Sequence, residues 1–296
     1  MTAVCFEING ALIFRFSGKD SPRYLNARLS NDIRNVKSDR AILAAALTAQ
    51  GRVEGLFSVS LELDGSFLLV CDGGDAPSVL TALKRYIVAD RVEVEDLSLS
   101  HSVLHLISDD TSALASFNPP DNVPLAFAFN GELRVLRRKR SAQLGIDVIG
   151  PRDKVQQLRS DLLNHNSEFW STERARFERL AAGIPAFPDE IGPDALLLEA
   201  DLSEAVSSRK GCYVGQEVLE KVQSHGKAPR RLVLLEGHGA IPAIGEPVRM
   251  AGTVLGKVSS VAAAPIGSSW LCFALLKNQE IPETLEVQDH AVRVRR

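Results

Sequence analysis

The segment of residues 209–217 combines residue types that could perform chemistry. Its sequence is Arg-Lys-Gly-Cys-Tyr-Val-Gly-Gln-Glu, so two cations precede Cys212 and glycines lie on both sides of it. Nearby cations stabilise the thiolate relative to the thiol, and the thiolate is the nucleophilic and metal-binding form of cysteine. Glycine carries no side chain that could cover the sulfur. The pattern therefore predicts a reactive, accessible thiol at Cys212.

The alternative for Cys212 is the commonest role of a free cysteine, that of a small buried hydrophobic residue. Cys5, Cys71 and Cys272 fit this alternative because each lies within an apolar segment typical of a strand. Cys212 has no such surroundings. The four cysteines are far apart and form no Cys-x-x-Cys pair, which argues against a disulfide framework and for reduced thiols.

Four neighbours of the cysteine are candidates for supporting roles. We assign stabilisation of the thiolate to Lys210 and Arg209, and orientation of a ligand by hydrogen bonding to Tyr213 and Gln216. A helix is expected to begin at Gln216, and its N-terminal amide groups and dipole would favour an anion nearby.

Residues 210–217 match the K-G-C-Y-x-G-Q-E signature of the YgfZ family. By this match the chain resembles folate-binding proteins that are similar to the aminomethyltransferase (T protein) of glycine cleavage and that assist iron–sulfur cluster assembly or repair. The matching motif residues are Lys210, Gly211, Cys212, Tyr213, Gly215, Gln216 and Glu217. The resemblance extends over nearly the whole chain, through residues 18–25, 31–33, 50–52, 182–185, 198–202 and 225–232.

The elements that must position this segment predict an α+β fold. In the first two thirds of the chain, strands and helices interleave without the strict rhythm of a parallel doubly wound sheet. From about Arg231, short alternating apolar runs separated by glycine and proline predict a small β-barrel. The resemblance implies the same architecture. It places a GcvT-like folate-binding region with a central hollow over residues 1–228 and a C-terminal β-barrel over residues 229–296.

The resemblance also implies tetrahydrofolate or a derivative as the cofactor, with three candidate contact residues. Arg52 and Glu54 lie at the shared Gln-Gly-Arg turn, and Glu199 lies in the shared segment of residues 198–202. Aminomethyltransferases carry a further acidic residue after this turn and a glutamate that hydrogen-bonds the pterin. Gly55 and Ala181 occupy the matching positions here, which argues against aminomethyl transfer.

The expected function, by resemblance, is that of a folate-binding accessory protein for iron–sulfur cluster assembly or repair. Its partners would be a reduced folate and iron–sulfur enzymes or cluster-assembly proteins, and its effect on tRNA thiomethylation would be indirect. The thiolate of Cys212 could ligate iron, carry sulfur, or undergo oxidation and reduction. One alternative is an enzyme proper, a folate-dependent aminomethyl transferase. The other is a binding module in which the motif only shapes a surface and Cys212 is dispensable.

The net charge and the spacing of two histidines argue against nucleic acid and metal ions as direct partners. With 34 Lys and Arg against 37 Asp and Glu, the net charge is −3, which does not favour nucleic acid as a direct partner. The basic run of residues 137–140 is a solvent-exposed strand end in one interpretation and an RNA or phosphate contact in another. His101 and His105 lack a third ligand, so no metal site is predicted.

The composition, 45% apolar and 24% charged, is that of a packed globular protein. No apolar run approaches the roughly 18 residues that span a bilayer, so no membrane segment is predicted. Residues 4–8 alternate like a strand, unlike a signal or transit peptide. Together with the reduced thiols, these features predict a cytoplasmic protein.

Overall fold

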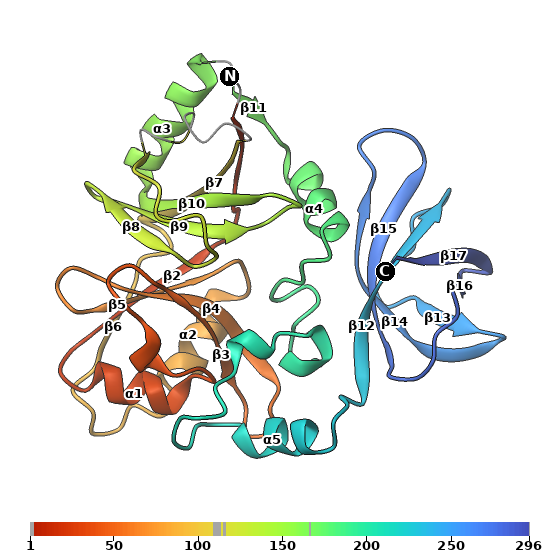
Figure 1. Ribbon diagram of the computed structural model, residues 1–296, viewed down its shortest axis with the longest axis horizontal. Coiled ribbons are helices and arrows are strands. Elements are labelled where there is room, and N and C mark those ends of the chain that lie inside the picture. The colour runs from red at the N-terminus through yellow and green to blue at the C-terminus, as the bar shows by residue number, and fades with distance from the viewer. Residues whose placement is uncertain (1–2, 109–113, 115–116, 166, 296) are drawn as a thin grey trace.

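A five-stranded antiparallel sheet forms the lower lobe of the computed structural model, which describes residues 3–108, 114, 117–165 and 167–295 (Figure 1). Its strand order is β3-β4-β5-β2-β6. The strands are β2 (Leu12–Ser17), β3 (Ile42–Leu47), β4 (Val53–Leu61), β5 (Phe67–Cys71) and β6 (Glu93–Asp96). Every residue of β3 and β5 is buried, which explains why these strands are continuous apolar runs in the sequence.

A six-stranded sheet forms the upper lobe, in the order β11-β1-β7-β10-β9-β8. All its pairs are antiparallel except β1 with β11. The strands are β1 (Val4–Glu7), β7 (His101–Ile107), β8 (Phe127–Asn130), β9 (Leu133–Lys139), β10 (Leu144–Pro151) and β11 (Glu168–Phe169). The two sheets meet through one apolar cluster that includes Ile13, Val70, Val103, Phe127 and Ile149.

The helices cover these sheets and connect them to the rest of the chain. They are α1 (Ser21–Arg28), α2 (Ala76–Lys84), α3 (Arg152–Asn164), α4 (Thr172–Ala181) and α5 (Gln216–Ser224), with short 3₁₀ turns η1 (Ile33–Asn35), η3 (Leu197–Ala200) and η4 (Ser203–Ala205). The side chain of Asp75 caps α2 by accepting a hydrogen bond from the N–H of Ser78, and Ser171 caps α4 in the same way. Helix α3 packs on β7 and β10, and α2 packs on β4.

A closed barrel of six strands follows, in the order β12-β15-β14-β13-β16-β17. Its strands are β12 (Arg230–His238), β13 (Pro247–Met250), β14 (Thr253–Ala263), β15 (Ser269–Lys277), β16 (Thr284–Val287) and β17 (His290–Arg295). Burial alternates along β12 and much of β14, as the sequence pattern predicts. Leu180 of α4 packs against Leu271 and Phe273 of the barrel, so α4 lies between the lobes and the barrel (Figure 1).

Candidate functional site

Cys212 lies on the loop between η4 and α5, and it is exposed to solvent. The other three cysteines, Cys5, Cys71 and Cys272, are buried in β1, β5 and β15. Burial raises the pKa of the thiol to about 12 for Cys5 and Cys272 and to about 11 for Cys71. The fold therefore separates one reachable sulfur from three that are both covered and protonated.

Native protein is accordingly expected to react with one equivalent of a maleimide, and guanidinium-unfolded protein with four, because the chain has four free cysteines. Mass spectrometry after a short reaction would count the adducts. The Cys212→Ala variant serves as the control and should remain unmodified under native conditions. Rapid native modification of that variant would contradict the assignment of Cys212 as the reachable thiol.

Lys210 is buried, and its ammonium group donates hydrogen bonds to three backbone carbonyl oxygens. Its Nζ atom lies 2.5 Å from the oxygen of Leu29 and 3.0 Å from that of Asn31, and it also contacts the oxygen of Asn26. These acceptors belong to the C-terminal end of α1 and the turn after it, where helical carbonyls lack partners within the helix. Burial lowers the pKa of Lys210 to about 8, and the carboxylate of Asp32 opposes this shift. Lys210 thus tethers the motif to α1.

Gly215, at the start of α5, packs against a turn formed by residues 48–52. Its φ of 85° lies in the left-handed region. A Cβ atom at this position would lie 2.6 Å from the carbonyl oxygen of Thr48 and 3.0 Å from the Cβ of Leu47. Both observations require glycine. Gly211 differs, because a Cβ atom there would meet no atom within 4 Å.

Tyr213 and Gln216 stabilise the motif loop itself. The backbone N–H of Tyr213 donates a hydrogen bond of 3.2 Å to Oε1 of Gln216. Nε2 of Gln216 donates to Glu220 at 2.5 Å, and Nζ of Lys210 lies 4.7 Å from the centre of the Tyr213 ring. Burial raises the pKa of Tyr213 to about 12. The remaining motif residues named from the sequence are exposed, namely Arg209, Gly211 and Glu217.

A large cavity lies beside α2 and β4, and we call it the α2 cavity. Its volume is about 1020 Å³, at the upper end of the range of small-molecule sites. Part of its wall is apolar, with Val53, Val79 and Phe187, and part is polar. The polar part includes Thr48, Gln50, Arg52, Glu54 and Arg85. Two of the predicted folate contacts, Arg52 and Glu54, therefore line one cavity.

Glu54 is held between two arginines in the cavity wall. Its Oε2 atom accepts a hydrogen bond of 2.7 Å from Arg28, and its Oε1 atom accepts one of 2.8 Å from Arg85. Arg28 is 1% exposed and also donates to the carbonyl oxygens of Leu47 and Ala82. Burial lowers the pKa of Arg28, and the charge of Glu54 opposes this shift. Because both its oxygens accept from guanidinium groups, Glu54 orders this part of the wall.

Arg52 and Glu199 have different partners from those expected. Nη1 of Arg52 donates to the carbonyl oxygen of Asp194 at 2.6 Å, and Arg230 at the start of β12 donates to the same oxygen at 2.5 Å. Glu199 is 3% exposed, and its carboxylate accepts two hydrogen bonds of 2.8 Å from Arg230 and one of 2.9 Å from the N–H of Leu196. Glu199 is absent from the described walls of the α2 cavity, and it joins the barrel to the 3₁₀ turn η3.

A second cavity of about 350 Å³ adjoins the first and shares Gly74, Phe187 and Pro188 with it. We call it the α4 cavity, because Arg176 and Arg179 of α4 contribute to its wall. The sequence analysis singled out none of these residues. The signal for them is weak, since each is a common residue type at an unremarkable spacing.

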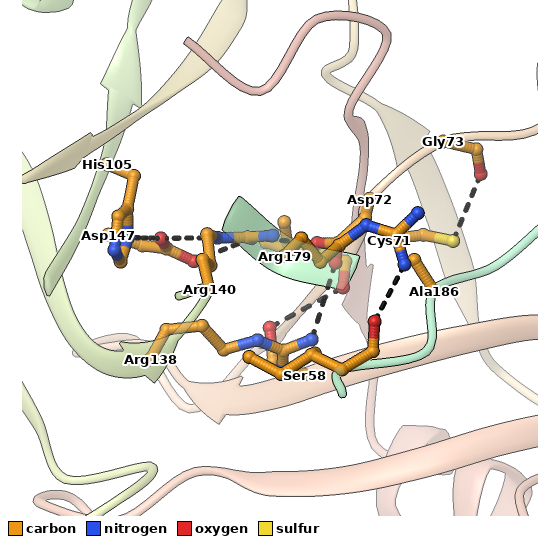
Figure 2. Close-up of polar contacts among 12 residues, drawn as sticks. Ser58, Cys71, Asp72, Gly73, His105, Arg138, Arg140, Asp147, Arg179 and Ala186 are labelled. Atoms are coloured by element: carbon orange, nitrogen blue, oxygen red, sulfur yellow. Dashed lines mark hydrogen bonds and ion pairs between the residues drawn. The ribbon is translucent and has the colours of Figure 1, made fainter. Parts of the chain in front are cut away.

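A series of buried charges borders the α4 cavity (Figure 2). Arg140 donates to Asp147 at 2.8 Å and to Asp72 at 2.7 Å, and Arg138 lies 3.5 Å from Asp72. Nδ1 of His105 lies 2.7 Å from Asp147. Burial lowers the pKa of His105, so the ring is neutral and donates from Nδ1. Asp72 follows β5 of the lower sheet, whereas the other residues lie in the upper sheet or, for Arg140, directly after its strand β9. This network therefore links the two lobes.

Within the basic run of residues 137–140, Lys139 is exposed at the end of β9, but the interpretation as a solvent-exposed strand end is wrong for Arg137 and Arg140. Arg137 and Arg140 are each 7% exposed. Nε of Arg137 donates to the carbonyl oxygen of Pro120 at 3.1 Å, whereas Arg138 and Arg140 pair with Asp72. Because both are buried and paired, Arg137 and Arg140 are not available to an RNA phosphate.

Comparisons with known proteins agree with this architecture. No protein-family model matches the chain. It is 25% identical over 304 residues to the iron-sulfur cluster assembly factor IBA57, mitochondrial, of Mus musculus, covering 96% of this chain and 80% of that protein. It is 26% identical over 316 residues to the tRNA-modifying protein YgfZ of Klebsiella pneumoniae, covering 94% of this chain and 87% of that protein. Over nearly its whole length the chain is thus similar to proteins named IBA57 and YgfZ.

The fold is that of the glycine cleavage system aminomethyltransferase T. The solved structure of that protein from Bartonella henselae matches with a TM-score of 0.84 and 18% identity, over 99% of this chain and 84% of that one. The predicted α+β fold with a C-terminal barrel is therefore confirmed. Among the described helices, none is long and apolar enough to cross a membrane.

Two positions distinguish this chain from the aminomethyltransferase pattern, Gly55 and Ala181. Gly55 lies in β4, and a Cβ atom there would lie 2.5 Å from the ring of Phe57, so the packed strand has no room for an acidic side chain. Ala181 packs with the apolar cluster between α4 and the barrel. Neither position offers a carboxylate to a cavity.

Proposed function

We propose that this chain is a folate-binding accessory factor for assembly or repair of iron–sulfur clusters, and that it acts through the Cys212 thiol. The observation that carries the proposal is an exposed cysteine motif packed directly against the wall of a cavity large enough for a cofactor. The names of two relatives state iron–sulfur cluster assembly and tRNA modification for those proteins. An effect on tRNA modification would be indirect, through a cluster-dependent enzyme.

The α2 cavity suits a reduced folate. Val53 and Phe187 offer an apolar surface to a pterin ring, and Arg52 and Arg85 offer donors to the carboxylates of the glutamate tail. Glu54 holds Arg85 in place through their 2.8 Å hydrogen bond. A bound reduced folate would supply a carrier of one-carbon units.

The motif loop is the proposed contact with iron–sulfur enzymes or cluster-assembly proteins. Cys212 is exposed and lies beside the exposed cation Arg209, so a partner can reach the sulfur without any rearrangement of the lobes. The cytoplasm is the location predicted from the sequence. The name of the mouse relative states a mitochondrial location for that protein.

An aminomethyl transferase is the alternative from a different functional class. Gly55 and Ala181 disfavour it, because they remove the two acidic side chains expected near the folate. Glycine-dependent formation of methylenetetrahydrofolate by the purified protein would support this alternative.

The decisive experiment uses cells that lack the protein and measures the activity of an iron–sulfur enzyme such as aconitase. Wild type should restore the activity. At matched soluble expression, Cys212→Ala should leave it at the level of the deletion cells, because the reachable thiol is gone. Cys272→Ala, which alters a buried barrel cysteine, is the matched control and should restore activity. Full restoration by Cys212→Ala would instead make the motif a scaffold.

A further inference from the structure

The turn of residues 48–52 separates the α2 cavity from the cysteine motif. Thr48, Gln50 and Arg52 line the cavity. Gly51 faces the motif instead, because a Cβ atom on it would lie 3.0 Å from the Cβ of Val218 on α5. One short turn therefore forms part of the cavity wall on one side and contacts the first turn of α5 on the other.

The contact between the turn and the motif is tight. The carbonyl oxygen of Thr48 approaches Gly215 so closely that a Cβ on Gly215 would lie 2.6 Å from it. The turn is closed by hydrogen bonds of 2.9 Å from the N–H of Thr48 to the oxygen of Arg52 and from the N–H of Gly51 to the oxygen of Thr48. Because close-packed groups transmit displacement, a shift of this turn must shift the motif backbone.

The end of α1 forms a second connection between the same two regions. Arg28 reaches Glu54 in the cavity wall at 2.7 Å. Carbonyl oxygens on either side of Arg28, those of Asn26 and Leu29, accept hydrogen bonds from Lys210 of the motif. The loop that carries the thiol is thus attached to the cavity wall on both sides of Cys212, at Lys210 and at Gly215.

Cys212 itself does not line the α2 cavity among the residues that the structure describes. A ligand in the cavity and the sulfur lie on opposite sides of the wall, so the two can be occupied together. We infer that a ligand in the α2 cavity controls the reactivity of Cys212 through the 48–52 turn and the end of α1. This inference rests on the proposed function, since it takes a reduced folate as the ligand.

The direction of the effect follows from the contacts. A folate packed against Thr48, Gln50 and Arg52 restricts the turn, and the turn restricts Gly215 and the loop before it. A restricted loop presents the sulfur in fewer orientations, so an added electrophile reacts more slowly. Coupling between two sites typically changes an equilibrium by 5- to 150-fold. We expect at least about a fivefold slower reaction at the lower end of that range.

The test measures the rate of N-ethylmaleimide addition to the native protein, with and without saturating 5-formyltetrahydrofolate. Calorimetry on the same samples measures binding of the folate. Val218→Ala removes the methyl groups of Val218, including Cγ1, which lies 3.1 Å from the position of a Cβ on Gly51. The variant should weaken the protection while the folate still binds. Val222→Ala, one turn further along α5, is the matched control and should keep the full protection.

Two results would overturn the inference while leaving folate binding intact. One is a normal calorimetric titration with an unchanged rate of addition, and the other is full protection in Val218→Ala. A flat titration has a different meaning, because it removes the folate and with it both the proposed cofactor and this inference. Calorimetry thereby distinguishes failure of the coupling from failure of the proposed function.

Discussion

The Gly215→Ala variant is expected to lose about 3 kcal/mol of unfolding free energy, the sum of about 1–2 kcal/mol for a left-handed backbone and 1–3 kcal/mol for overpacking. Gly215 has a φ of 85°, and an added Cβ would lie 2.6 Å from the carbonyl oxygen of Thr48. Because that oxygen belongs to a hydrogen-bonded turn, it cannot withdraw without opening the turn.

Thermal unfolding followed by circular dichroism would measure the loss. A difference of 3 kcal/mol corresponds to a melting temperature lower by roughly 6–12 °C for a protein of this size class. Gly211→Ala is the matched control in the same motif, since an added Cβ there meets no atom within 4 Å. It should change stability by less than about 0.5 kcal/mol. Equal melting temperatures for the two variants would contradict the packing described for Gly215.

The Arg140→Met variant is expected to lose about 3–5 kcal/mol of unfolding free energy at neutral pH, a loss typical of removing one partner from a buried ion pair. Asp147 has a side chain that is 2% exposed, and Asp72 one that is 21% exposed. Both would lose the guanidinium that now pairs with them. Arg137→Met is the matched control, because Arg137 is equally buried but its side chain, among the residues that the structure describes, donates only to the carbonyl oxygen of Pro120. About 1 kcal/mol is expected for that loss.

The difference in unfolding free energy between wild type and Arg140→Met should also become smaller as the pH falls from 7 to 5. Burial raises the pKa of Asp147, but the charge of Arg140 and the hydrogen bond from His105 outweigh it and hold that pKa well below its usual range. Without Arg140, burial dominates, and the folded-state pKa rises above the unfolded value of about 3.9. The folded variant then binds more protons than the unfolded chain, so acid stabilises it relative to wild type. Denaturant unfolding at pH 7, 6 and 5 would measure this, and a constant deficit would contradict the buried-pair explanation.

Local chemistry alone was enough to predict the exposed cysteine and the barrel. Cys5, Cys71 and Cys272 lie in apolar runs that become buried strands, whereas Cys212 follows two cations in a glycine-containing segment that stays exposed. Alternation along residues 232–235 and 253–258 predicts barrel strands, because side chains of a strand point to opposite faces. These properties depend on neighbours within a few residues, which the sequence displays directly.

The site residues were harder to predict where their roles depend on distant partners. Arg28 lies on the buried face of α1 with Tyr24 and Leu25, and a lone arginine on such a face is a signal that could have identified it. The sequence does not show which group the carboxylate of Glu199 pairs with. In the fold that carboxylate binds Arg230.

The position of the candidate thiol, the order of the elements and the family resemblance follow from the sequence alone, because each is encoded in contiguous residues. The roles of Lys210 and Arg140 depend on the folded arrangement. Lys210 donates to carbonyl groups more than 170 positions away, and Arg140 pairs with Asp72 at a separation of 68. A charged side chain looks the same in sequence whether it meets water, a ligand or a buried acceptor. Which of these partners a charged side chain has depends on whether it is buried, and burial arises only when the lobes pack together.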